Sequence, residues 1–148
     1  MTTGRASLHD RSMARAVRAL GAARLSFLAG AWLFVACVVI QVFLVGLDIF
    51  ARLDGEVHRD FAYVYGWLVP ILVLLSGAAR VPSGTRTLTL VLLVLFAAQT
   101  VLPSLRDQVP MLAALHTVNA LAIFAIGIVI ARRATDWIRP GREPAVPR

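Results

Sequence analysis

Residues 25–50 read LSFLAGAWLFVACVVIQVFLVGLDIF and contain only two strongly polar side chains, Gln41 and Asp48. An α-helix rises about 1.5 Å per residue, and about 20 residues are enough to cross a hydrocarbon core of about 30 Å. The run is also too long for the apolar region of a cleaved signal peptide. It therefore predicts a transmembrane helix.

Three further apolar runs follow, at residues 61–79, 88–105 and 111–130. Hydrophobic residues make up 59% of the 148 residues and charged residues only 16%, a composition more apolar than that of soluble domains. Short connections between successive spans favour antiparallel neighbours. We therefore expect an all-α integral membrane protein, a four-helix up-down-up-down bundle.

Three prolines add local expectations. Pro70 and Pro103 fall inside predicted spans, where a missing N–H should kink the helix. Pro110 precedes the fourth run, at a first helical position that needs no N–H. The sequence thus predicts two bends and one helix start.

The charge of the chain points to membrane topology. All fifteen basic residues are arginines, and the formal net charge is +7. Twelve of them precede the first run, lie between the second and third runs, or follow the fourth: Arg5, Arg11, Arg15, Arg18, Arg24, Arg80, Arg86, Arg132, Arg133, Arg139, Arg142 and Arg148. The other three are Arg52, Arg59 and Arg106. The positive-inside rule then predicts a multi-pass protein of the cell inner (plasma) membrane with both termini in the cytoplasm. This placement argues against a nucleic-acid partner and makes the lipid bilayer the first partner.

Three regions follow from this topology. Residues 1–24 are predicted to form a cytoplasmic basic amphipathic arm, since Arg11, Arg15 and Arg18 share one face of a helix. A frayed tail is the alternative for this arm. Residues 25–131 form the four-helix transmembrane domain, and residues 132–148 form a cytoplasmic tail.

An internal repeat relates the two halves of the transmembrane domain. A shift of 58 positions places Gln41 on Gln99, His58 on His116, and Ala62 on Ala120. Polar side chains are rare and costly within membrane spans, so the paired Gln and His carry most of this signal. Each unit contains two spans, so the units are parallel repeats related by an axis along the membrane normal.

The repeat predicts that His58 and His116 face each other near the outer end. The diagonal of a four-helix square is about 11–14 Å, a span that two histidines bound to one iron can bridge with bonds of about 2 Å. Ala62 and Ala120 lie one helical turn after the histidines and would leave space for a flat macrocycle. Gln41 and Gln99 would donate hydrogen bonds to the site or bridge neighbouring helices.

A family resemblance adds to this interpretation. His58-Arg59 with Gly66 eight residues later, and Gln99 followed by His116-Thr117-Val118-Asn119-Ala120, resemble one four-helix half of haem A synthase. They are also similar to a group of short actinobacterial four-span proteins. The resemblance covers about residues 30–132 and implies paired axial ligation of haem by His58 and His116. In haem A synthase a Glu precedes the His-Arg pair by three positions, whereas Glu56 precedes it by two, so no catalytic role carries over.

We therefore expect a b-type haem protein with haem b held by His58 and His116. Two axial imidazoles favour one-electron transfer over oxygen binding. Arg59 and Arg106 would pair with the haem propionates or contact lipid headgroups. The expected role is an outer-leaflet electron mediator that exchanges with quinone or a larger membrane complex.

Three other functions stay open. The histidines would solvate span ends in a haem-free structural or accessory subunit of a larger complex. A divalent metal such as zinc would need further ligands, recruited from Asp48, Glu56, Asp60 or Asp107. A small-solute transporter would use Gln41, Gln99 and Asn119 to line a path, although hydrogen bonding between helices is the usual role of such side chains.

Overall fold

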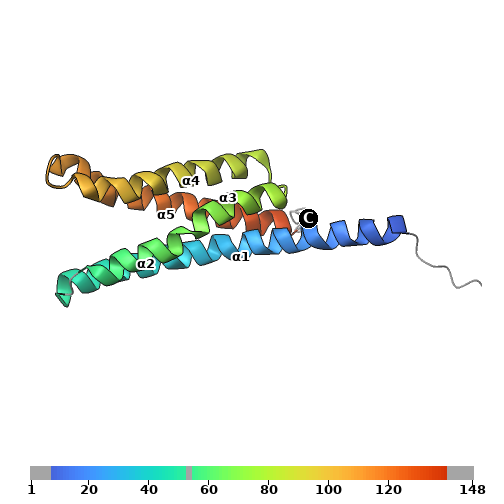
Figure 1. Cartoon of the computed structure of the whole chain (residues 1–148), viewed down its shortest axis with the longest axis horizontal. Coiled ribbons are helices and arrows are strands. Elements are labelled where there is room, and N and C mark those ends of the chain that lie inside the picture. Colours follow the sequence, from blue (N-terminus) through green and yellow to red (C-terminus); the bar gives the residue numbers. More distant parts are fainter. Residues whose placement is uncertain (1–7, 53–54, 140–148) are drawn as a thin grey trace, which may run out of the picture.

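The computed structural model describes residues 8–52 and 55–139, and all regular structure in these two ranges is helical (Figure 1). The elements are α1 (Leu8–Phe50), α2 (Glu56–Gly66), α3 (Leu68–Ala78), α4 (Ser83–Val101), the 3₁₀ helix η1 (Leu102–Leu105) and α5 (Pro110–Ile138). The predicted all-α class is confirmed.

Four helical stretches in these ranges are long and apolar enough to cross a membrane. They are Asp10–Phe50, Glu56–Ala78, Ser83–Leu105 and Pro110–Ile138, and each contains one of the four predicted runs. The prediction of a membrane protein with four spans is thus supported by length and composition. The type of membrane and the direction of crossing stay predictions.

Three prolines lie where a helix is interrupted or begins. The second span is divided between α2 and α3 at Trp67, because Pro70 has no N–H to donate to the carbonyl of Gly66. Pro103 lies in η1, where the third span tightens into a 3₁₀ turn. Pro110 is the first residue of α5. The helix start at Pro110 is confirmed, whereas the second and third spans are interrupted near Pro70 and Pro103 and the bends themselves stay predictions.

The helices pack closely over one part of their length. There α1 contacts α3 and α5, and α4 contacts the same two helices. Every buried side chain in the described ranges falls within residues 27–38, 65–96 and 123–134. We call these three segments the closed half.

An aromatic cluster and two glycines bring the helices of the closed half together. The ring of Phe34 lies 6.0 Å from that of Tyr65 and 6.2 Å from that of Phe96, measured between centroids. A Cβ atom at Gly66 would lie 2.9 Å from the Phe96 ring, and one at Gly127 would lie 3.3 Å from two carbons of Phe34. Small residues that allow close approach are the usual means by which membrane helices associate.

The remaining parts of the spans are built differently. Residues 39–64 and 97–122, which we call the open half, contain no buried residue among those that the structure describes. Here α2 packs mainly on α1, while η1 packs on α4 and α5. The chain therefore forms two hairpins that diverge toward this end (Figure 1).

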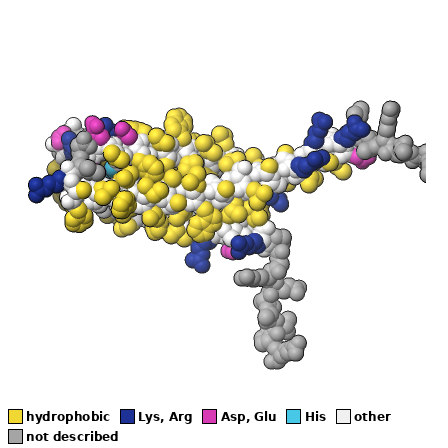
Figure 2. All heavy atoms as spheres, turned by 90° about the horizontal axis from the view of Figure 1, so that it is seen from below, with side chains coloured by type: hydrophobic (Ala, Val, Ile, Leu, Met, Phe, Trp, Pro, Cys, Tyr) yellow, Lys and Arg dark blue, Asp and Glu magenta, His cyan; other side chains and the backbone are white. Residues whose placement is uncertain are grey.

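Helix α1 extends well beyond the closed half at the other end. Residues 8–24 continue the helix of the first span without a break, and Met13 and Val17 are exposed on them. Figure 2 shows arginine side chains on this projecting segment, whereas hydrophobic side chains cover most of the visible surface of the bundle. Whether the segment lies on a membrane surface, as an amphipathic arm would, stays a prediction.

The two predicted domain boundaries do not coincide with helix ends. Helix α5 continues through residue 131 to Ile138, and the Arg24 guanidinium lies 4.7 Å from the centre of the Trp137 ring. This cation–π contact joins α1 and α5 at the basic end. The other predicted parts of the arm and the tail, residues 1–7 and 140–148, lie outside the described residues.

Candidate functional site

The first hairpin of the open half joins Gln41 of α1 to His58 of α2. The Gln41 side-chain nitrogen Nε2 lies 3.3 Å from His58 Nε2 and donates to the backbone carbonyl of His58 at 2.9 Å. An amide nitrogen only donates, so His58 Nε2 accepts and the neutral ring carries its proton on Nδ1. The contact thus leaves the Nε2 lone pair of His58 directed at the amide.

The second hairpin repeats this contact between Gln99 of α4 and His116 of α5. The Gln99 amide nitrogen lies 3.1 Å from His116 Nε2, and His116 Nδ1 donates to the backbone carbonyl of Gln99 at 3.0 Å. A backbone carbonyl on Nδ1 fixes the tautomer in which Nε2 bears the lone pair, as is usual for histidines that ligate metals. His116 is therefore held through both ring nitrogens.

Asn119 completes the polar network of the second hairpin. Its side-chain nitrogen donates to the Gln99 side-chain oxygen at 2.7 Å and to the backbone carbonyl of Leu95 at 2.8 Å. Gln99 thus accepts through its oxygen and donates through its nitrogen. Asn119 lies three positions after His116, and this spacing of two polar residues could have indicated a supporting contact.

The first hairpin lacks an equivalent of Asn119. Gln41 Oε1 and His58 Nδ1 are both buried, and neither has a hydrogen-bond partner among the residues that the structure describes. Buried polar atoms normally find a partner in the protein, in water or in a ligand. This side of the site therefore has one acceptor and one donor available to a polar group.

The two histidines lie on different hairpins, and both side chains are half-buried. Ala62 and Ala120, predicted to leave space next to them, are also half-buried. The structure therefore brings each glutamine to its histidine, whereas the approach of the two histidines to each other stays a prediction.

Aromatic rings connect this region to the closed half. Phe61 lies three residues after His58, and its ring centroid is 5.3 Å from that of Tyr65. The Tyr65 ring is 5.6 Å from that of Phe96 on α4, in an edge-to-face arrangement. Such pairs add cohesion beyond their buried area. They form an apolar floor below the polar pairs.

Arg59 and Arg106 lie at the outer rim of the site, on the exposed surface. Arg59 is 3.6 Å from a carboxylate oxygen of Glu56 and 3.5 Å from one of Asp60, while Arg106 is 3.6 Å from one of Asp107. Exposed pairs of this kind contribute about 0–1 kcal/mol. Both guanidinium groups can therefore exchange these partners for another anion at little cost.

A divalent metal finds no set of ligands in the described parts of the chain. Within residues 8–52 and 55–139 no group of three or more His, Cys, Asp or Glu side chains could hold a metal ion. Asp48, Glu56, Asp60 and Asp107, the recruits that zinc would need, do not gather around the histidines. Two imidazoles alone are too few ligands for zinc, which takes three or four from a protein.

Comparison with known proteins gives one match. The model of a family of unknown function, DUF6220, matches residues 41–105, which include Gln41, His58 and Gln99 but end before His116. No curated protein and no solved structure matches the chain. The resemblances to haem A synthase and to short actinobacterial proteins thus stay predictions from the residues alone.

Proposed function

We propose that the protein is a membrane cytochrome that binds one haem b between its two hairpins, with His58 and His116 as axial ligands. The observation that carries the proposal is the repeated pair: in each hairpin a glutamine amide contacts the Nε2 atom of a half-buried histidine. The two pairs lie at equivalent positions of the 58-residue repeat.

The chemistry of the two rings supports ligation. Both contacts favour the tautomer with its proton on Nδ1, which leaves Nε2 able to donate its lone pair to iron. The Nε2 lone pair cannot accept a hydrogen bond while it binds iron. Each glutamine amide would therefore leave Nε2 and could donate to another acceptor. The unpaired Nδ1 of His58 and Oε1 of Gln41 would then belong to the polar surroundings of the bound group.

The shape of the molecule supports a ligand between the hairpins. The open half has no buried core of its own among the described residues, and α2 makes its main contacts with α1. An apolar macrocycle there would join the hairpins above the floor formed by Phe61, Tyr65 and Phe96. Ala62 and Ala120 would leave space for the flat macrocycle, and Arg59 and Arg106 would meet the propionates at the rim.

Paired imidazoles determine the class of reaction. With both axial positions filled, haem supplies one-electron transfer and has no open position for oxygen. We place the site near the outer face of the plasma membrane, in an up-down-up-down bundle of two parallel repeats with both termini inside. Its partners would be quinone or a larger membrane complex.

An absorption spectrum of the purified full-length chain tests the proposal. Protein expressed with an ample haem supply is expected to carry about one haem per chain and to show the sharp visible band of reduced bis-imidazole haem. His58→Ala and His116→Ala should each abolish that band. His9→Ala replaces the remaining histidine, at the start of α1, and should leave it unchanged.

Two results would overturn the proposal. One is a folded protein, shown by gel filtration and circular dichroism, that takes up no haem. The other is a band that survives both substitutions. A colourless protein that copurifies with a defined set of membrane subunits would favour the alternative, a haem-free structural or accessory subunit.

A further inference from the structure

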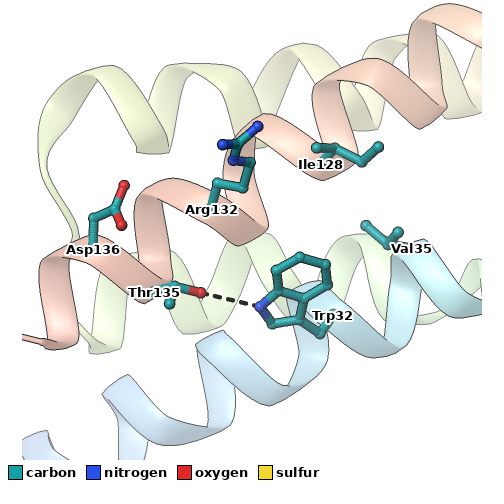
Figure 3. Close-up of a pocket in the computed structure, with 6 residues that line it drawn as sticks. All are labelled: Trp32, Val35, Ile128, Arg132, Thr135 and Asp136. Atoms are coloured by element: carbon teal, nitrogen blue, oxygen red, sulfur yellow. Dashed lines mark hydrogen bonds between the residues drawn. The ribbon is translucent and has the colours of Figure 1, made fainter.

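A second site lies at the opposite end of the molecule, in a groove between α1 and α5 (Figure 3). Its volume is about 480 Å³. Two residues of α1 and four of α5 line it: Trp32, Val35, Ile128, Arg132, Thr135 and Asp136. The pattern within one helix does not indicate this groove, because its two walls are about a hundred residues apart in the chain.

One wall of the groove is held in place by hydrogen bonds. Trp32 Nε1 donates to Thr135 Oγ1 at 3.1 Å, and that hydroxyl donates to the backbone carbonyl of Ala131 at 2.9 Å (Figure 3). The indole is therefore fixed across the two helices. Tryptophan is typical of the interface between hydrocarbon and headgroups, so the groove is expected at that depth.

The groove changes from apolar to charged along its length. Val35 is buried and Ile128 is half-buried at the end that faces the middle of the spans. Arg132 and Asp136 lie one and two turns further along α5, toward the basic end of the molecule. This order of apolar, aromatic and charged surface matches an amphiphile whose head lies at the membrane interface.

The two charges are available to a ligand. Arg132 and Asp136 are both exposed, and neither forms an ion pair or a hydrogen bond with any residue that the structure describes. A spacing of four residues would allow them to pair with each other on the helix. Instead, they present opposite charges about 6 Å apart along the helix axis.

We propose that this groove binds phosphatidylethanolamine. The lipid phosphate would bind the Arg132 guanidinium, its primary ammonium would bind the Asp136 carboxylate, and an acyl chain would lie along Val35 and Ile128. A purely anionic lipid is a worse fit, because its headgroup has no ammonium for Asp136 and its negative charge is repelled by that carboxylate. A quaternary ammonium, as in phosphatidylcholine, has no N–H to donate.

Lipid competition on the full-length chain tests this site. Protein in detergent is titrated with phosphatidylethanolamine, phosphatidylglycerol and phosphatidylcholine of the same acyl chains, and bound lipid is counted by native mass spectrometry. Phosphatidylethanolamine should bind about three- to tenfold more tightly than the other two, as expected for exposed charge-assisted contacts. Equal binding of all three lipids, or tighter binding of phosphatidylglycerol, would overturn the proposal.

Two substitutions separate this site from a general basic surface. Asp136→Asn should reverse the preference between phosphatidylethanolamine and phosphatidylglycerol, whereas Arg132→Gln should weaken both by about three- to tenfold. Arg133→Gln removes the same charge from the next residue of α5, which does not line the groove, and should change neither affinity nor preference. A lipid preference that Asp136→Asn leaves unchanged, or an equal loss with Arg133→Gln, contradicts the proposed site.

Discussion

The closed and open halves of this molecule are built from the same four spans but use them in different ways. In the closed half, buried side chains from α1, α3, α4 and α5 fill the space between the helices. In the open half the described residues bury nothing fully, and polar pairs replace the apolar core. One half holds the spans together, and the other carries two half-buried histidines where no described residue is buried.

The difference is informative because apolar contact between helices gains little free energy in a membrane. Lipid tails are as apolar as leucine, so helix association there depends on close packing and on hydrogen bonds between helices. The closed half is held by close packing at Gly66, Gly127 and the aromatic cluster. The open half keeps costly polar groups without close packing, which is the pattern expected where function rather than stability sets the sequence.

The largest expected effect on stability comes from removing a buried side chain from the closed half. Phe34 is 1% exposed and Phe43 is 64% exposed on the same helix. Phe34→Ala should lower the free energy of unfolding by about 2–4 kcal/mol through lost packing. Phe43→Ala should change it by less than about 0.5 kcal/mol, since lipid replaces the lost contacts. Unfolding in mixed micelles of increasing denaturing detergent gives both values, and equal losses would remove the distinction between the halves.

A methyl group added to a tight contact should have the next largest effect. A Cβ at Gly127 would crowd the Phe34 ring, whereas one at Gly46, in the open half of α1, would have no neighbour within 4 Å. We expect Gly127→Ala to destabilise the fold by about 1–3 kcal/mol. Gly46→Ala should be neutral or should stabilise it by up to about 1 kcal/mol through helix propensity. The same unfolding assay checks the pair, and a neutral Gly127→Ala would show that α1 and α5 are not closely packed.

The two hairpins of the open half can be compared with each other. Gln99 bonds to both His116 and Asn119, while Gln41 leaves its own side-chain oxygen without a partner. Gln99→Leu should therefore cost about 0.6–1.7 kcal/mol of stability, the range of hydrogen bonds between membrane helices. Gln41→Leu should cost less, because it also removes an unsatisfied buried acceptor. A larger loss for Gln41→Leu would mean that its oxygen has a partner.

The smallest effect on stability is expected at the exposed arginine Arg59. Arg59 contacts two exposed carboxylates, Glu56 and Asp60. Arg59→Gln should change the free energy of unfolding of the haem-free protein by less than about 0.5 kcal/mol. A haem titration of the same variant should show weaker binding if the guanidinium meets a propionate. Loss of stability without haem would instead assign Arg59 a structural role.

The sequence predicted the elements better than their packing. Apolar length located the four spans, and Pro70, Pro103 and Pro110 marked two interruptions and one helix start. The glutamine and the histidine of each repeat unit are 17 positions apart, and the structure brings Gln41 into contact with His58 and Gln99 into contact with His116.

The division into halves could not be predicted in this way. Within a run such as residues 25–50, side chains that face lipid and side chains that face another helix are equally apolar, so periodicity does not separate them. The close approach of Gly66 to Phe96 and the bond from Trp32 to Thr135 join residues distant in the chain. The asymmetry between the hairpins depends on Asn119, whose counterpart at the equivalent repeat position is Phe61.

The spin state of ferric haem bound to the full-length chain is the most direct test of the central claim, that both imidazoles reach one iron. Electron paramagnetic resonance of the reconstituted wild-type protein should give a low-spin signal, since two nitrogen ligands fill the axial positions. His58→Ala and His116→Ala should each lose that signal and leave high-spin or unbound haem. A high-spin wild-type signal, or a low-spin signal that persists in either variant, would contradict the account.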